Sequence, residues 1–143
     1  ICEYFKIPSF KVVVAGSGKD SVLNDIRNDK RFVLINKYVS DEDFANLIRY
    51  TKCVICPYVS GSQSGIPQSA MVFGTPVVAT KVGAFPEFIE EGKNGYLVDY
   101  GDTKGMAMAI SKILDGKFLQ GFVPEHLKWD NIAKQVIKIL CRI

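Results

Sequence analysis

Five short runs of apolar, largely β-branched residues recur along the chain, and stretches with helical spacing separate them. The runs predict strands at residues 10–15, 32–35, 54–56, 76–79 and 95–98. Because they are uniformly apolar instead of alternating, they are typical of a parallel sheet that helices cover on both faces. We therefore predict a Rossmann-like three-layer α/β/α domain built on a parallel sheet of about five strands.

Helices are expected between and after these strands. The pattern predicts them at residues 21–27, 41–50, 63 or 64 to 72, 85–91, 102–114 and 125–141. Ser40 is the expected N-cap of the second helix, and Gly74 is expected to end the third. In the last helix five apolar positions predict a face that packs on the core: Leu127, Ile132, Val136, Ile139 and Leu140.

Length and composition favour one ordinary globular domain spanning residues 1–143. Hydrophobic residues make up 48% and charged residues 23%, which excludes a disordered chain. No apolar run approaches the roughly 18 residues of a membrane span. The net charge of +3 comes from scattered lysines, which indicates a solvated face, so we expect no nucleic-acid partner. The chain begins at Ile1 without Met, and we expect it to be part of a longer protein.

Metal-binding and redox chemistry find little support. Cys53 and Cys56 match a CxxC pattern, but they lie in a predicted strand, where residues three apart point to opposite faces. They could not close one metal site or one disulfide, so we expect buried, reduced thiols. His126 is the only histidine, and no Ser-His-Asp set accompanies it. We expect no metal site.

Ligands of doubly wound sheets bind outside the carboxyl ends of the strands. Four Gly/Ser-containing loops fall there, at residues 16–19, 36–40, 57–65 and 80–85. The third precedes a helix, and its N–H groups and hydroxyls could hold phosphate oxygens.

The first loop, Gly16-Ser17-Gly18, is half of a dinucleotide fingerprint. Ser21 replaces the third glycine, and no acidic residue ends a strand about 20 residues on, which disfavours an NAD site. A tight turn close to another ligand and a turn without a ligand both remain open.

Two further runs carry a family resemblance. Residues 70–87 read AMVFGTPVVATKVGAFPE, and residues 91–98 read EGKNGYLV. They resemble the C-terminal domain of group 1 glycosyltransferases, which have the two-domain GT-B architecture and mostly act with retention. Residues 39–48, VSDEDFANLI, and Trp129 with the Ile132-Ala-Lys run extend the likeness over nearly the whole chain.

The resemblance implies a nucleotide-diphosphate sugar donor of the UDP or GDP type, with no other cofactor and no metal. The base would lie near residues 36–39, and the diphosphate near residues 16–18 and 61–67. The implied substrate-binding residues are Gly16, Ser17, Gly18, Lys37, Tyr38, Val39, Gly61, Ser62, Gln63, Ser64, Gly65, Ile66, Gln68 and Ser69. No catalytic residue is assigned.

By the same resemblance, the sugar would pass to an acceptor hydroxyl in bacterial polysaccharide or glycoconjugate synthesis. The glycan or lipid-linked acceptor would bind an N-terminal domain that residues 1–143 do not include. The resemblance implies a cytoplasmic protein, and it leaves peripheral association with the inner face of the membrane open.

One departure from the family pattern bears on the donor site. The family has two glutamates, separated by seven residues, just before the Ala-Met pair. Here those positions are Gly61 (Ser62 with a one-residue gap) and Ser69. Ser69 or Gln68 would then hold the ribose by neutral, weaker hydrogen bonds.

Two other hypotheses about the function of the chain therefore stay open. One is a non-catalytic nucleotide-sugar-binding or regulatory module with a degenerate acidic motif. The other is a generic doubly wound domain, such as a receiver or a flavin binder. A receiver would carry an acidic cluster at the end of the first strand, where this chain has Ala15 and Gly16.

Overall fold

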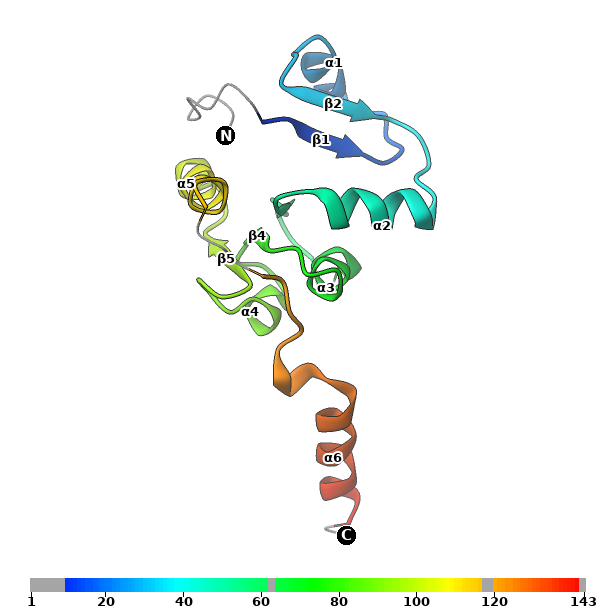
Figure 1. Ribbon diagram of the computed structural model, residues 1–143, viewed down its shortest axis with the longest axis vertical. Helices are drawn as coiled ribbons and strands as arrows, with labels where there is room; N and C mark the ends of the chain where they lie inside the picture. Colours follow the sequence, from blue (N-terminus) through cyan, green and yellow to red (C-terminus); the bar gives the residue numbers. More distant parts are fainter. Residues whose placement is uncertain (1–9, 62–63, 117–119, 142–143) are drawn as a thin grey trace.

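Strands and helices alternate through most of the chain in a computed structural model that describes residues 10–61, 64–116 and 120–141 (Figure 1). The strands are β1 (Val12–Ala15), β2 (Phe32–Ile35), β3 (Val54–Cys56), β4 (Val77–Thr80) and β5 (Gly95–Val98). The helices are α1 (Val22–Arg27), α2 (Asp41–Tyr50), α3 (Gly65–Val72), α4 (Phe85–Phe88), α5 (Thr103–Leu114), the 3₁₀ helix η2 (Glu125–Leu127) and α6 (Trp129–Leu140).

Every strand pair is parallel, which confirms the Rossmann-like α/β class and the five predicted strands. The strands are nevertheless shared between two sheets, β1–β2 and β3–β4–β5, where one continuous sheet was expected. Val12 pairs with Phe32 in the first sheet, and Val54 pairs with Val77 in the second. The division arises because β1 and β3 do not pair with each other.

The hydrophobic core surrounds β4, whose four residues are all buried. On one face, Val77 and Ala79 belong to a cluster formed with α2, α3 and α4. On the other face, Val78 packs in a cluster with Met106 and Ile110 of α5. This second sheet therefore has the three layers that its apolar strands predicted.

The two cysteines of the CxxC pattern lie on opposite faces of this sheet. Cys56 belongs to the cluster on the α3 side, whereas Cys53 packs against the cluster on the α5 side. The interpretation that they point to opposite faces is confirmed.

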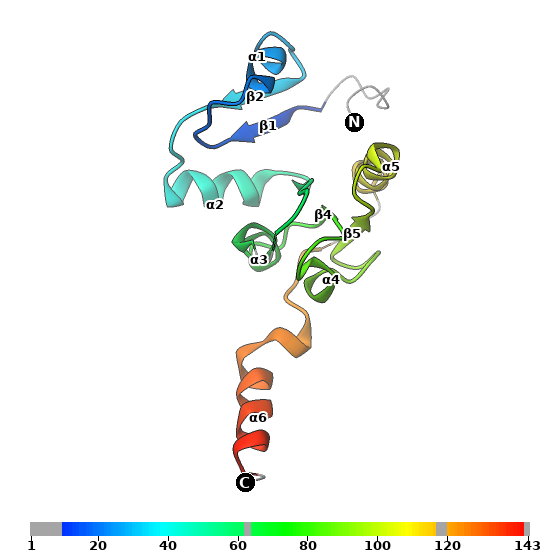
Figure 2. The same cartoon turned by 180° about the vertical axis from the view of Figure 1, so that it is seen from behind.

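The β1–α1–β2 unit contributes nothing to either cluster, and none of the residues in these three elements is buried. Val13 and Val33, which pair across the two strands, are 45% and 42% exposed. Figure 2 shows this unit at one end of the molecule and α6 at the other. The β-branched runs thus form strands here without the burial that such runs usually have.

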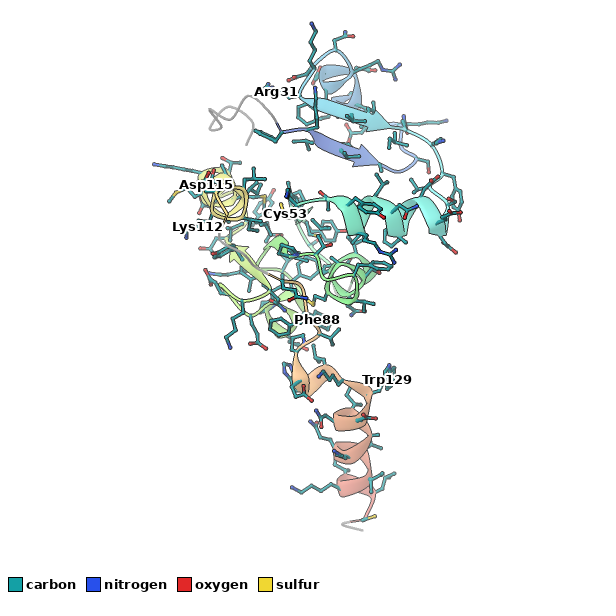
Figure 3. The ribbon with its side chains drawn as sticks, viewed as in Figure 1. Arg31, Cys53, Phe88, Lys112, Asp115 and Trp129 are labelled. Carbon is teal, nitrogen blue, oxygen red and sulfur yellow. The ribbon has the colours of Figure 1, made fainter. Side chains whose placement is uncertain are left out.

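Helix α6 extends away from the rest of the chain (Figures 1 and 2). Val136, Ile139 and Leu140 are 48%, 66% and 63% exposed, so the prediction that they pack on the core is wrong. Figure 3 shows Trp129, 83% exposed, at the start of this helix. An amphipathic pattern indicates an apolar face, but it does not say what covers that face.

Candidate functional site

The loops after β1 and β2 are joined by one side chain. Asn36 Oδ1 accepts a hydrogen bond from the N–H of Gly18 at 2.9 Å, and its Nδ2 donates to the Gly18 carbonyl at 3.0 Å. Gly16, with a φ of +140°, turns the chain out of β1, and its N–H donates to the Ile35 carbonyl. The two loops predicted to hold diphosphate and base are therefore adjacent. The Gly18 N–H is already used within the protein.

The predicted base-contacting residues follow Asn36 directly. Lys37 is exposed, Tyr38 is 79% exposed and Val39 is half-buried. Tyr38 is thus largely open to solvent, two residues after the Asn36 that contacts Gly18. An exposed aromatic ring is a surface on which a planar base can stack.

The loops after β3 and β4 are joined through Tyr58. Thr80 Oγ1 donates to the Tyr58 carbonyl at 2.6 Å, and the Tyr58 ring lies 5.4 Å from the ring of Phe85, centroid to centroid. The Tyr58 hydroxyl lies 3.3 Å from Ser64 Oγ. Tyr58 therefore connects the end of β3, the beginning of α3 and the beginning of α4.

The N-terminus of α3 offers fewer free donors than its sequence suggested. Ser64 caps the helix by accepting from the Ile66 N–H at 3.3 Å, and Pro67 has no N–H. Among the described residues, the Gly65 N–H has no hydrogen-bond partner, and a Cβ added there would meet nothing within 4 Å. The anion-binding capacity of this helix end thus centres on Gly65.

The other predicted residues of this region have mixed positions. Gly61 and Gln68 are exposed, and Ser69 is half-buried on α3. No acidic residue lies in the first turn of α3. Ser62 and Gln63 lie outside the described residues. Neutral groups therefore occupy the described positions where the family pattern has its glutamates.

An ion pair lies at the neighbouring strand ends. Lys81 Nζ is 3.4 Å from Asp99 Oδ1, between the carboxyl ends of β4 and β5. These residues line a cavity of about 240 Å³ that continues along α5 to Lys112, whose Nζ lies 5.1 Å from the centre of the Tyr96 ring. Among the predicted substrate-binding residues that the structure describes, none lines this cavity.

The predicted site consequently divides in two. Asn36 brings the loops of the first sheet together, and Tyr58 with Thr80 brings the loops of the second sheet together. Sequence reasoning missed all three of these residues as positioning groups. An amide residue directly after a strand end was the available signal for Asn36.

Other site chemistries find no support in the part of the chain that the structure describes. It contains no group of three His, Cys, Asp or Glu side chains that could hold a metal ion. Its helices are all too short or too polar to cross a membrane. Burial raises the pKa of Cys53 to about 11 and that of Cys56 to about 12, so both thiols are protonated at neutral pH.

Comparison with known proteins decides the family. The family model described as "Glycosyl transferases group 1" matches residues 3–116, which span every element from β1 to α5. The chain belongs to the group 1 glycosyltransferases. The resemblance carried by residues 70–98 is thereby confirmed.

Three relatives of this group 1 glycosyltransferase domain carry different names. It is 30% identical to the D-inositol 3-phosphate glycosyltransferase of Corynebacterium urealyticum, over 68% of this chain and 25% of that protein. It is 27% identical to the phosphatidyl-myo-inositol mannosyltransferase of Mycolicibacterium smegmatis, over 94% of this chain and 37% of that protein. It is 28% identical to the N-acetyl-alpha-D-glucosaminyl L-malate synthase of Bacillus anthracis, over 82% of this chain and 32% of that protein. The chain thus spans between a quarter and two fifths of the length of these curated relatives.

Proposed function

We propose that this domain binds a nucleotide-diphosphate sugar and that a longer protein containing it transfers the sugar to an acceptor hydroxyl. The observation that carries the proposal is the family match over residues 3–116, joined by relatives named as glycosyltransferases. The relatives' names mention D-inositol 3-phosphate, phosphatidyl-myo-inositol and L-malate, which are different molecules. An acceptor is therefore not assigned, and we place its binding outside residues 1–143.

The donor would lie across the carboxyl ends of the strands. Gly65 would donate its N–H to the diphosphate, beside the positive end of the α3 dipole. Ser17, exposed in the loop after β1, would add a hydroxyl. The base would stack near Tyr38, and Gln68 with Ser69 would hold the ribose hydroxyls through neutral hydrogen bonds.

In the transfer step, the bond between the anomeric carbon and the diphosphate breaks, and a bond to the acceptor oxygen forms. Negative charge accumulates on the departing diphosphate, and the proton of the acceptor hydroxyl would pass to that diphosphate or to solvent. Donors that already point at that charge lower the barrier, because they need not reorganise. Gly65 would serve in this way, whereas the residues that act on the acceptor would come from elsewhere in the longer protein.

Nucleotide titration tests the donor site. Amide NMR spectra of the 143-residue chain would be recorded against UDP, GDP and ADP. Shifts are expected at Gly16, Gly18, Tyr38 and Gly65. The nucleotide that binds with the lowest Kd identifies the preferred base. No shift at millimolar concentrations of all three would overturn donor binding by this domain.

Activity assays separate the transferase from a non-catalytic module. We expect the isolated chain to transfer no sugar, because we place acceptor binding outside residues 1–143. The longer protein should release nucleoside diphosphate from the donor when a suitable acceptor is present. If the longer protein bound the nucleotide but released none across acceptors of the relatives' types, the module would be the better description.

A further inference from the structure

The backbone and the ring of Tyr58 are held by buried residues of the second sheet. Its carbonyl accepts a hydrogen bond from Thr80 Oγ1 at 2.6 Å, and its ring lies 5.4 Å from the Phe85 ring, centroid to centroid. Thr80 and Phe85 are only 4% and 3% exposed, so both anchors belong to the interior. The half-buried Tyr58 side chain therefore has a fixed direction, and its hydroxyl lies at the beginning of α3.

The Tyr58 hydroxyl contacts the residue that caps this helix. It lies 3.3 Å from Ser64 Oγ, which also accepts a hydrogen bond from the Ile66 N–H at 3.3 Å. A hydroxyl offers one donor and two acceptor positions, so Ser64 can make both bonds at once. Rotation of the Ser64 side chain away from its capping position would break both of them. Tyr58 thus restrains the cap as well as contacting it.

The conformation of Ser64 determines where the next N–H points. Because the peptide unit is planar, the direction of the Gly65 N–H is set by the ψ angle of Ser64, which is 133°. Gly65 itself has no side chain that could hold this peptide in place. The extended conformation of Ser64 therefore directs the N–H that has no partner among the described residues.

We propose that Tyr58 is a positioning residue of the donor site, whose hydroxyl acts through Ser64 to hold the Gly65 N–H ready for the diphosphate. The inference rests on the donor site proposed above, and it adds a residue that need not touch the donor. A donor group that is already oriented loses less freedom on binding than one that must first be ordered. It also needs no reorganisation when charge develops on the leaving diphosphate.

A double-mutant cycle tests whether Tyr58 acts through Ser64. Tyr58→Phe removes the hydroxyl and keeps the ring that packs on Phe85. In the 143-residue chain, the Kd of the preferred nucleoside diphosphate among UDP, GDP and ADP should rise about fivefold. In a Ser64→Ala background, the same substitution should change Kd by less than about twofold, because the residue that transmits the effect is gone.

The NMR spectra give a second measurement from the same titrations. At saturating nucleotide, the amide shift of Gly65 should be smaller in Tyr58→Phe than in the parent, whereas the shift of Tyr38 should be unchanged. A hydroxyl that only stabilised the fold would not separate the diphosphate end of the site from the base end. This comparison needs only the single variant, so it tests the proposal even if Ser64→Ala does not fold.

Tyr96→Phe is the matched control. Tyr96 is 8% exposed and packs in the cluster on the α5 side of the same sheet. Its loss of a hydroxyl should leave Kd within about twofold of the parent. Urea denaturation of each variant establishes that it is folded under the conditions of the titration.

The outcomes separate this inference from the donor site itself. A parent chain that binds none of the three nucleotides would overturn the donor site, and the role of Tyr58 with it. A parent that binds while Tyr58→Phe binds equally well, with an unchanged Gly65 shift, would overturn the role of Tyr58 alone. An equal loss of affinity with and without the Ser64 hydroxyl would also overturn it, because Tyr58 would then act by another route.

Discussion

The side-chain amide of Asn36 pairs with both backbone groups of Gly18, at 2.9 Å and 3.0 Å. One side chain at the end of β2 thereby fixes the loop that leaves β1. Both loops belong to the proposed donor site, so the shape of half of that site depends on a residue that need not touch the donor.

Replacing this amide should loosen the loop and weaken nucleotide binding. For Asn36→Ala we expect a loss of about 1 kcal/mol in binding free energy, or about fivefold in Kd, because the two lost hydrogen bonds are exposed. NMR titration with the preferred nucleotide gives Kd directly. Asn36→Asp keeps one acceptor but adds a negative charge beside the diphosphate, so it should bind more weakly than Asn36→Ala.

Asn46→Ala, on the exposed face of α2, is the matched control and should leave Kd unchanged. If Asn36→Ala and Asn46→Ala bound nucleotide equally well, the loop at residues 16–19 would have no part in binding.

Asn94 should be one of the most sensitive positions for stability. It is fully buried, accepts from the Glu90 N–H at 2.8 Å, and donates to the carbonyls of Phe88 and Phe122 at 3.0 and 3.1 Å. Asn94→Ala leaves these backbone groups without partners, and we expect the free energy of unfolding to fall by about 3 kcal/mol. Urea denaturation monitored by circular dichroism measures the change.

The same experiment on Asn46→Ala should show a change within about 0.5 kcal/mol, as for most surface substitutions. A similarly small effect of Asn94→Ala would mean that water replaces the lost bonds.

Gly95 leaves no space for a side chain. A Cβ there would collide with the Val77 carbonyl of the neighbouring strand and lie 3.1 Å from Ile89 Cγ2. Gly95→Ala should therefore push β5 from β4 and lower the free energy of unfolding by about 3 kcal/mol. Thermal denaturation would measure this loss of stability as a lower Tm.

Gly65→Ala provides the comparison, because a Cβ at this position meets nothing within 4 Å. Its stability should stay within about 1 kcal/mol of the parent, since Ala is accepted at the start of a helix. Equal Tm values for the two variants would show that β4 and β5 can separate at little cost.

Thiol labelling should distinguish the three described cysteines. Burial raises the pKa of Cys53 to about 11 and of Cys56 to about 12, whereas Cys141 is exposed. Because the thiolate is the reactive form, Cys141 should react with iodoacetamide at pH 8 in the native protein, and the other two only after unfolding. Peptide mass spectrometry locates the label.

The Cys141→Ser variant is the control, and it should leave Cys53 and Cys56 unlabelled in the native state. Native labelling of both would contradict the packing of Cys53 and Cys56 on opposite faces of the second sheet.

The local pattern of the sequence was sufficient to predict most elements of the fold. The apolar runs located all five strands, and Ser40 caps α2 as expected, accepting from the Asp43 N–H at 3.2 Å. Strand pairing was harder, because the apolar runs of β1 and β3 indicate strands without identifying the neighbour of each. For the same reason, the pattern of α6 indicated an apolar face that this chain leaves exposed.

The candidate site was predictable at the level of loops and less so at the level of atoms. Gly and Ser content identified the loops after β1 and β3. It could not show that the Gly18 N–H is taken by Asn36, or that Pro67 and the Ser64 cap leave Gly65 as the donor of α3. These details depend on which side chains come into contact after folding. Nucleotide binding at these loops stays a prediction.

The distribution of buried residues means that this chain should not melt as one cooperative body. Among the described residues, the buried ones begin at Ile48 of α2, and the elements from β1 to β2 have none. Residues 10–40 would open at a lower free energy than the domain around β4. A protease that samples open states would cut there first and leave a resistant core beginning near α2.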